Sequence, residues 1–380
     1  MALPLQGLRL LDLSRQLPGP FCSMMLADLG MEVVVIAAPD DPLGAGVPLI
    51  QRNKRSLTLN LKTERGRDVF YRLAAGADVV LEGSRPGVAK RLGIDYETLR
   101  ERNPRLIYCS ISGYGQDGPY RDVVGHDINY IGYAGILSVT GPAGGAPVIP
   151  GVQIGDIGGG ALMAAVGILT AIIGRQTTGE GQFVDVAMMD GSVAWNVVHA
   201  LLHFLRGREP RGGETQLTGQ YPCYAVYETR DAKYVTVGAL EPHFWRNLCE
   251  RLGFPDCVEE QYPEGARREE MLVRFRGKFR EKTRDEWIEE LRGVDICFGP
   301  VNTIEEMARD PQVAHREMVV TVRGGKRGPL RVLGNPIKLS ATPGSIRTPP
   351  PSFGEHTEEI LGEVGYSASD VGELRAAGVV

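Results

Sequence analysis

GLRLLDLSRQLPGPFCSMMLADLGMEVVVIA, residues 7–37, decides the fold class of this chain. Residues 8–14 and 31–37 are short and mostly apolar, which is typical of strands buried on both faces of a parallel sheet. Between them, residues 20–30 have the pattern of a helix that ends at Gly30. A strand, a helix and a second strand in this order predict a βαβ unit.

The same alternation continues along the first half of the chain. Residues 63–77 predict a helix, and residues 78–84 and 105–112 predict two further strands. We therefore predict an α/β fold with a doubly wound, Rossmann-like large domain. The turn at 15–20, RQLPGP, lacks the G-x-G-x-x-G spacing that lets a backbone approach a dinucleotide, which argues against a nicotinamide-dependent enzyme.

The composition is that of a globular protein with more than one domain. The chain has 380 residues, of which 43% are hydrophobic and 23% charged, and this balance excludes intrinsic disorder. The net charge of −5 argues against a protein that mainly holds nucleic acid. The N-terminus has no secretory pattern, so we expect a cytoplasmic protein that does not act at a membrane. The longest apolar run, 161–174, is shorter than the ~20 residues of a membrane span and predicts a core helix.

Six scattered cysteines contain no C-x-x-C pair, so we expect reduced thiols and no metal site.

For the domain organisation, residues 207–222 have almost no apolar content at their start and predict a linker. The predicted parts are listed here in chain order: a large domain at 1–206, the linker at 207–222, a small α+β domain at 223–305, a proline-rich return linker at 306–350, and a C-terminal segment at 351–380 that rejoins the large domain.

Three residues at predicted helix starts are candidates for proton transfer. His126 begins an apolar helical pattern, where an imidazole can act as a neutral base, although a helix cap beside a solvated histidine is the simpler interpretation. Asp156 precedes three glycines and either only caps a helix or takes part in chemistry. The bare backbone of Gly158–Gly160 implies close approach of a ligand or of a partner chain. Glu241 precedes Pro242, the expected first residue of a helix.

Basic residues follow or flank the early strands. Doubly wound folds bind ligands near strand ends, so these residues either hold a phosphate-rich ligand or form a solvated face. They are Arg52, Lys54, Arg55, Lys62, Arg85, Lys90 and Arg91. His199 and His203 lack the glutamate of H-E-x-x-H, which excludes the zinc-protease interpretation.

Seven segments in order resemble the family III CoA-transferase and α-methylacyl-CoA racemase superfamily of CaiB/BaiF type. They are GLRLLDLSRQLPGPFCSMMLADLGMEVVVI (7–36), NKRSLTLNLK (53–62), VVLEGSRPGVAKRLGI (79–94), NPRLIYCSISGYGQDGPY (103–120), GHDINYIGYAGIL (125–137), GDIGGGALMAAVGILTAI (155–172) and GEGQFVDVAMMDGSV (179–193). GHDINY and the later ALEPHFW resemble the racemase branch, whose active-site histidine, aspartate and glutamate fall on His126, Asp156 and Glu241.

The resemblance also implies an interlocked homodimer, in which Glu241 of one copy serves His126 of the other. CoA enters as part of the substrate, without a prosthetic group. The family's CoA-contacting positions match Leu59, Asn60, Leu61, Lys62, Gly83, Ser84, Arg85, Arg91, Gly125, Asp127 and Tyr130. Racemases of the family typically carry phosphate-binding arginines after the second strand, whereas this strand ends VVVIAAPD. Arg52, Lys54 or Arg55 are the candidates to replace them.

The resemblance implies racemisation of a 2-methyl or otherwise 2-substituted acyl-CoA by proton transfer through an enolate. The alternative is CoA transfer between carboxylic acids, with Asp156 as the nucleophile. A third, non-enzymatic interpretation is an inactive CoA-binding scaffold. The acyl group is not defined by the sequence, since Met163, Met188 and Met189 either line an acyl pocket or pack in the core.

Overall fold

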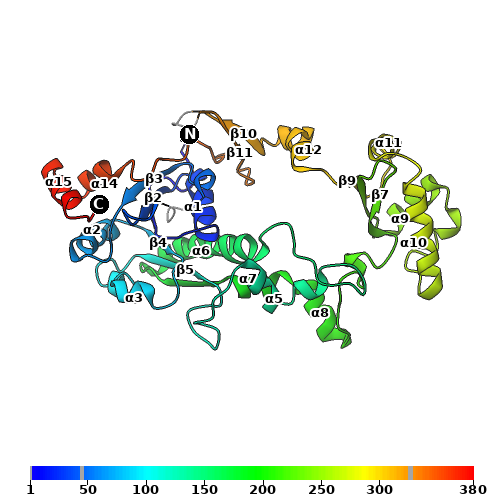
Figure 1. Ribbon diagram of the computed structural model, residues 1–380, viewed down its shortest axis with the longest axis horizontal. Helices are drawn as coiled ribbons and strands as arrows, with labels where there is room; N and C mark the ends of the chain where they lie inside the picture. Colours follow the sequence, from blue (N-terminus) through cyan, green and yellow to red (C-terminus); the bar gives the residue numbers. More distant parts are fainter. Residues whose placement is uncertain (1, 43–46, 324–327) are drawn as a thin grey trace. The chain divides into compact units, whose positions relative to one another are not determined.

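The computed structural model describes residues 2–42, 47–323 and 328–380. The chain forms two compact units, and each is described by itself. Unit 1 comprises Met1–Ala134, Gly151–Asn196 and Gln312–Val380, and unit 2 comprises Gly135–Pro150 and Val197–Pro311. Figure 1 labels most of the helices and strands and colours the chain from the N-terminus to the C-terminus.

Unit 1 is built on a six-stranded parallel sheet. Its strands are β1 (Arg9–Asp12), β2 (Glu32–Ala37), β3 (Lys54–Thr58), β4 (Val79–Glu82), β5 (Ile107–Ser112) and β6 (Phe183–Ala187). Their spatial order is β3-β2-β1-β4-β5-β6, so the order reverses between β1 and β4. This confirms the predicted α/β fold class with a doubly wound parallel sheet.

Helices cover both faces of this sheet, which explains why its strands are apolar throughout. Consecutive strand residues point to opposite faces, so Leu10 packs under one helical layer and Leu11 under the other. The Leu10 face is covered by α1 (Pro18–Asp28) and α6 (Met163–Thr178). The Leu11 face is covered by α2 (Glu64–Ala75), α4 (Tyr96–Arg100), α14 (Thr357–Glu363) and α15 (Ala368–Ala376).

The other elements of unit 1 are short. They are α3 (Val88–Leu92), α5 (Asp127–Tyr133), a π-helical segment η4 (Ile154–Leu162), α7 (Met188–Trp195), and the antiparallel pair β10 (Val319–Val322) and β11 (Leu330–Leu333). α13 (Pro311–His315) lies where the chain passes from unit 2 to unit 1. Single 3₁₀ turns occur at Pro48–Ile50, Leu137–Val139, Gln216–Thr218 and Pro255–Cys257.

The predicted core helix is longer than the apolar run that suggested it. η4 and α6 join into one helix, Ile154–Thr178, which is long and apolar enough to cross a membrane and is the only such helix in the described ranges. Half of its most apolar window is buried inside the protein. Ala164 and Ile168 pack in the unit 1 core, whereas Ile173 points outward and is exposed.

Unit 2 packs helices on a small antiparallel sheet. The sheet begins with an antiparallel hairpin of β7 (Tyr224–Glu228) and β8 (Tyr234–Gly238), and β9 (Phe298–Pro300) pairs with β8. Its helices are α8 (Val197–Arg206), α9 (Pro242–Leu252), α10 (Gly265–Phe279), α11 (Arg284–Glu290) and α12 (Ile304–Arg309). Trp245, Trp287 and Phe275 are fully buried and form the centre of this core.

The boundaries of the two units differ from those of the predicted domains. The predicted large domain, 1–206, includes residues 135–150 and 197–206, which belong to unit 2. The loop at 135–150 packs against the segment after α8, because the Gly212 N–H donates to the Ser138 carbonyl at 3.1 Å. This pairing joins positions far apart in the sequence, so composition alone does not reveal it.

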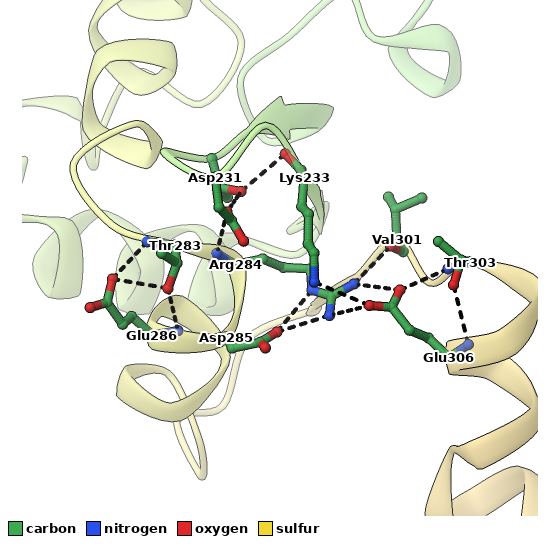
Figure 2. A network of polar contacts seen from close by, with 10 residues as sticks. Asp231, Lys233, Thr283, Arg284, Asp285, Glu286, Val301, Thr303 and Glu306 are labelled. Atoms are coloured by element: carbon green, nitrogen blue, oxygen red, sulfur yellow. Dashed lines mark hydrogen bonds and ion pairs between the residues drawn. The ribbon is translucent and has the colours of Figure 1, made fainter.

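A network of polar contacts holds the segment by which the chain leaves unit 2 (Figure 2). Arg284, at the start of α11, binds both carboxylate oxygens of Glu306 in α12, at 2.8 and 2.9 Å. Lys233 donates to the same carboxylate at 3.2 Å, and Thr303 contributes its backbone N–H at 2.9 Å. The exit segment is thereby fixed to the sheet and to α11.

Candidate functional site

The carboxyl ends of all six unit 1 strands lie at one edge of the sheet, because the strands are parallel. β3 runs into Leu59–Lys62, and β4 runs into Gly83–Arg85. Ser14, which follows β1, lies beside Gly83, since a Cβ atom on Gly83 would be 3.7 Å from that of Ser14. Doubly wound sheets bind ligands at this edge, where the strand order reverses. The predicted CoA-contacting loops therefore lie at the edge where a ligand is expected.

The predicted contact positions differ in what they offer a ligand. Lys62, Gly83, Arg85 and Arg91 are exposed, and Asn60, Leu61, Ser84, Gly125 and Asp127 are half-buried. Leu59 and Tyr130 are buried, so neither presents its side chain freely.

The buried carboxylate of Glu82 fixes the loop after β4, because it accepts the Ser84 N–H at 2.7 Å and the hydroxyl of Ser110. Burial raises the pKa of Glu82.

Two guanidinium groups lie near the start of α3. Gly87 has a left-handed backbone, with φ of +84°. A Cβ atom on Gly87 would lie 3.4 Å from the guanidinium of Arg121 and 3.5 Å from that of Arg91. Sequence reasoning selected Arg91 and missed Arg121, which lies in a polar loop with no motif of its own. Together the two cations can bind an anionic group.

The three basic residues proposed to replace the missing phosphate-binding arginines are committed elsewhere, and that interpretation was wrong. Arg52 is 2% exposed and pairs with Asp28 at 2.7 Å. Lys54 is buried 3.6 Å from Asp12, and burial lowers the pKa of its ammonium group to about 8. Arg55 pairs with glutamates of β2 and α14. All three lie at the beginning of β3, whereas the ligand edge is at its other end.

His126 is the residue immediately before α5, in extended backbone conformation with an exposed side chain. Its N–H donates to the Asn129 side chain at 3.0 Å, and its carbonyl accepts the Asn129 N–H at 2.8 Å. The Tyr130 hydroxyl donates to the Gly125 carbonyl at 2.5 Å. The backbone on both sides of His126 is therefore fixed, while its imidazole remains accessible.

Asp156 lies in the first turn of η4 and is half-buried. It does not cap this helix, as one interpretation expected: its own N–H donates to Asp127 Oδ1 at 2.9 Å, so Asp127 supplies the capping oxygen. Burial, together with the charge of Asp127, raises the pKa of Asp156 to about 6, and His126 opposes the shift. The charges of His126 and Asp127 therefore both act on the carboxylate of Asp156.

The glycines after Asp156 allow close packing of a neighbouring helix of the same chain. A Cβ atom on Gly159 would lie 2.4 Å from the Met188 carbonyl, and one on Gly158 would lie 2.8 Å from the Trp195 ring. In return, a Cβ atom on Gly191 would lie 2.3 Å from the Gly159 carbonyl. The expectation that a ligand or partner chain approaches this backbone was wrong, because α7 occupies the position.

Glu241 belongs to unit 2 and directly precedes α9, with Pro242 as the first helical residue. Its carboxylate is exposed, and its carbonyl accepts the Trp245 N–H at 3.1 Å. Beside it, the Tyr262 hydroxyl donates to the Leu240 carbonyl at 3.1 Å. The relation of Glu241 to His126 stays a prediction.

Four tyrosines form a cluster next to His126 that sequence reasoning missed. Tyr114 packs edge-on against Tyr130 and Tyr133, with ring centroids 5.3 and 5.5 Å apart, and Tyr120 contacts Tyr133. Tyr120 and Tyr133 are exposed and offer an aromatic surface beside the site. Four tyrosines within 20 positions were the available signal. The methionines considered for an acyl pocket, Met163, Met188 and Met189, pack in or against the unit 1 core.

Comparisons with known proteins agree with the motifs. The family model described as CoA-transferase family III matches residues 5–357. The chain is 38% identical to alpha-methylacyl-CoA racemase of Mus musculus, over 99% of this chain and 97% of that protein. It is 33% identical to succinyl-CoA:glutarate CoA-transferase of Homo sapiens, over 99% and 90%. A solved CAIB/BAIF family protein from Brucella suis has a TM-score of 0.83 at 30% identity, covering 96% of this chain and 100% of that one.

Proposed function

Because the chain belongs to CoA-transferase family III, we propose that it is a racemase or epimerase of 2-methyl, or otherwise 2-substituted, acyl-CoA thioesters. The observation that carries this proposal is the pairing of a fixed, exposed histidine with an aspartic acid of raised pKa. His126 and Asp156 act on each other electrostatically and belong to the starts of two neighbouring helices. A 1,1-proton transfer removes a proton from one carbon atom and returns a proton to the same atom, so it needs one group as the base and a second group as the acid.

The reaction begins at the α-carbon of the thioester, whose proton is weakly acidic. His126 removes this proton, and the electron pair left on the α-carbon delocalises onto the thioester oxygen as an enolate. The Asp127 N–H has no acceptor among the described residues, so it is free to donate to that oxygen. A donor already in place stabilises the enolate without reorganisation.

Asp156 then returns a proton to the opposite face of the α-carbon, which inverts the configuration. With a pKa of about 6, roughly one-tenth of Asp156 carries a proton at neutral pH. For the opposite enantiomer the roles reverse, with Asp156 as the base and the protonated imidazole as the acid. The protons balance in both directions, so no acceptor molecule is consumed.

We further propose that Glu241 of a second copy orients the imidazole of His126, which makes the homodimer the active form. Glu241 is suited to this role because its carboxylate is exposed at the start of α9 and its backbone is anchored in that helix. An orienting carboxylate selects one tautomer and one rotamer of a catalytic histidine.

The second candidate function is CoA transfer between carboxylic acids, with Asp156 as the nucleophile. The similarity to a succinyl-CoA:glutarate CoA-transferase favours it. In that reaction the Asp156 carboxylate attacks the thioester carbonyl, CoA leaves as a thiolate, and an acyl–aspartyl anhydride remains. The ionised form of Asp156 is required, and with a pKa of about 6 this form predominates at neutral pH, so the pKa of Asp156 is compatible with either reaction.

The deciding experiment is an incubation of purified enzyme with a 2-methylacyl-CoA in deuterated water, without a carboxylic acid acceptor. We expect deuterium to enter at the α-carbon with inversion of configuration, which proton NMR and mass spectrometry detect. In His126→Ala we expect the rate of this exchange to fall by about 10²–10⁴-fold. Near wild-type exchange in His126→Ala would contradict the assigned base. Absence of exchange, together with borohydride trapping of an acyl adduct on Asp156, would establish the transferase.

A further inference from the structure

The side chain of Asp127 reaches from α5 to the start of η4. Its Oδ1 atom accepts the backbone N–H of Asp156 at 2.9 Å. A Cβ atom on Gly155 would lie 3.1 Å from the same oxygen, so the absence of a side chain there leaves room for the carboxylate. The Asp127 carboxylate is thus held against the backbone of Asp156, and its charge acts on Asp156, although 29 positions separate the two residues in the sequence.

The groups around Asp156 single out Asp127 as its negative neighbour. At α5 the titratable groups are His126, Asp127, Tyr130 and Tyr133, and the charges that shift the pKa of Asp156 are those of Asp127 and His126. The remaining ones on elements packed against η4 act elsewhere. Asp28 of α1 pairs with Arg52, Arg175 of α6 pairs with Asp78, and Asp190 of α7 acts on Asp185 of β6. The other titratable residues on these elements and on β5 are Cys22, Tyr108 and Cys109.

We propose that Asp127 is a positioning residue for Asp156: its hydrogen bond fixes the start of η4 and holds a negative charge beside Asp156. The catalytic consequence rests on the function proposed above. The structural part does not, because it concerns two residues of this chain whatever substrate they serve.

A two-base proton transfer explains why such a neighbour is useful. An ordinary aspartic acid is protonated in only about one molecule in a thousand at neutral pH and cannot serve as a proton donor. Burial alone would achieve part of the change, but complete burial would close Asp156 to the substrate. A fixed negative charge adds to the proton affinity while Asp156 stays half-exposed.

Asp127→Asn separates the charge from the hydrogen bond. The asparagine keeps an oxygen for the Asp156 N–H and keeps the backbone N–H proposed for the enolate, and it removes only the charge. We expect the pKa of Asp156 to fall by about one unit, the usual size of the effect of a neighbouring charge. It is read directly from the side-chain carboxyl signal in ¹³C NMR of aspartate-labelled protein, assigned by its loss in Asp156→Asn.

In the pH profile of α-proton exchange for the enantiomer that Asp156 protonates, the alkaline limb should move to lower pH by the same amount. The rate at neutral pH should fall by up to about tenfold, as the protonated fraction of Asp156 does. Asp127→Glu retains the charge and is expected to retain the alkaline limb. Asp122→Asn removes an exposed carboxylate of the loop before α5, whose ion pair within the described ranges is with Arg121, and is expected to change neither readout.

An unchanged Asp156 signal in Asp127→Asn would overturn the proposal, as would an equal fall in Asp127→Glu. The two proposals fail separately. If wild-type enzyme shows no α-proton exchange, the racemase assignment fails while the NMR titration still tests the effect of Asp127 on Asp156. Melting curves of each variant establish that the compared proteins are folded.

Discussion

Arg284 and Glu306 form a doubly hydrogen-bonded ion pair that joins α11 to α12, with the Arg284 side chain 8% exposed (Figure 2). The planar guanidinium fits both carboxylate oxygens at once, which an ammonium group does not. Arg284→Lys is therefore expected to lower the melting temperature of the protein. Arg292→Lys, in the exposed pair with Glu289, is the matched control and is expected to leave it unchanged.

The same pair makes a prediction for pH. The Arg284 hydrogen bonds hold the pKa of Glu306 well below its usual range, so the pair stabilises the folded state above the unfolded pKa near 4.5. That contribution is lost as the pH falls through the lower, folded pKa. The difference in melting temperature between wild type and Arg284→Lys should therefore shrink in acid; a constant difference would show that packing, not the pair, is responsible.

Asp156→Asn is expected to stabilise the protein at neutral and basic pH. Burial and the charge of Asp127 raise the pKa of Asp156 from 3.8 to about 6, so the folded state disfavours its ionised form. This cost is absent below the unfolded pKa, grows as the pH rises between the two values, and is complete above the folded pKa. Melting temperatures of both proteins across this range test it. A gain of equal size in acid would contradict the assignment.

Tyr130→Phe removes the hydroxyl that holds the Gly125 carbonyl and leaves the ring in place. We expect a loss of about 1 kcal/mol in stability, the usual value of such a hydrogen bond. Because His126 directly follows Gly125, a looser Gly125 carbonyl disturbs the position of the base, and kcat is expected to fall by a larger factor than KM changes. Tyr133→Phe, in an exposed ring of the same cluster, is the control. Equal kinetic effects in the two variants would argue against a positioning role for Tyr130.

Gly159→Ala is expected to destabilise unit 1 by about 1–3 kcal/mol, the usual cost of overpacking. The new methyl group would lie 2.4 Å from the Met188 carbonyl, which cannot move without displacing α7. Gly174→Ala, further along the same helix, meets only the flexible end of Gln182 at 3.6 Å and should gain up to about 1 kcal/mol from helix propensity. Chemical denaturation measures both, and similar values for the two would contradict the packing explanation.

Apolar periodicity was sufficient to predict most of the sheet. The runs at 31–37 and 105–112 correspond to β2 and β5 within one or two residues, and both strands are buried on two faces. β3 was missed, because it begins with Lys54 and Arg55 and looks too polar for a buried strand. Its charges are tolerated because carboxylates of β1, β2 and α14 meet them, and a single sequence does not show which distant residues will be opposite.

The candidate site was predictable in its residues but not in its connections. Helix-start patterns and motif resemblance selected His126 and Asp156. The two residues interact because α5 and η4 lie next to each other in the fold. The role of Asp127 was invisible, since a carboxylate that caps a different helix leaves no local pattern. The same holds for the glycines after Asp156, whose purpose is defined by α7.

The order in which unit 1 is completed has a consequence for synthesis on the ribosome. Its last sheet strand, β6, ends at Ala187, whereas α14 and α15, which cover Leu57 and Phe70, begin only at Thr357. At roughly 5–20 residues per second, that apolar face waits on the order of ten seconds or more for its cover. During this interval α2 and α4 cover that face only in part, and the apolar area that α14 and α15 will cover stays exposed on the nascent chain. Its yield in a cell should therefore depend on chaperones that bind such surfaces.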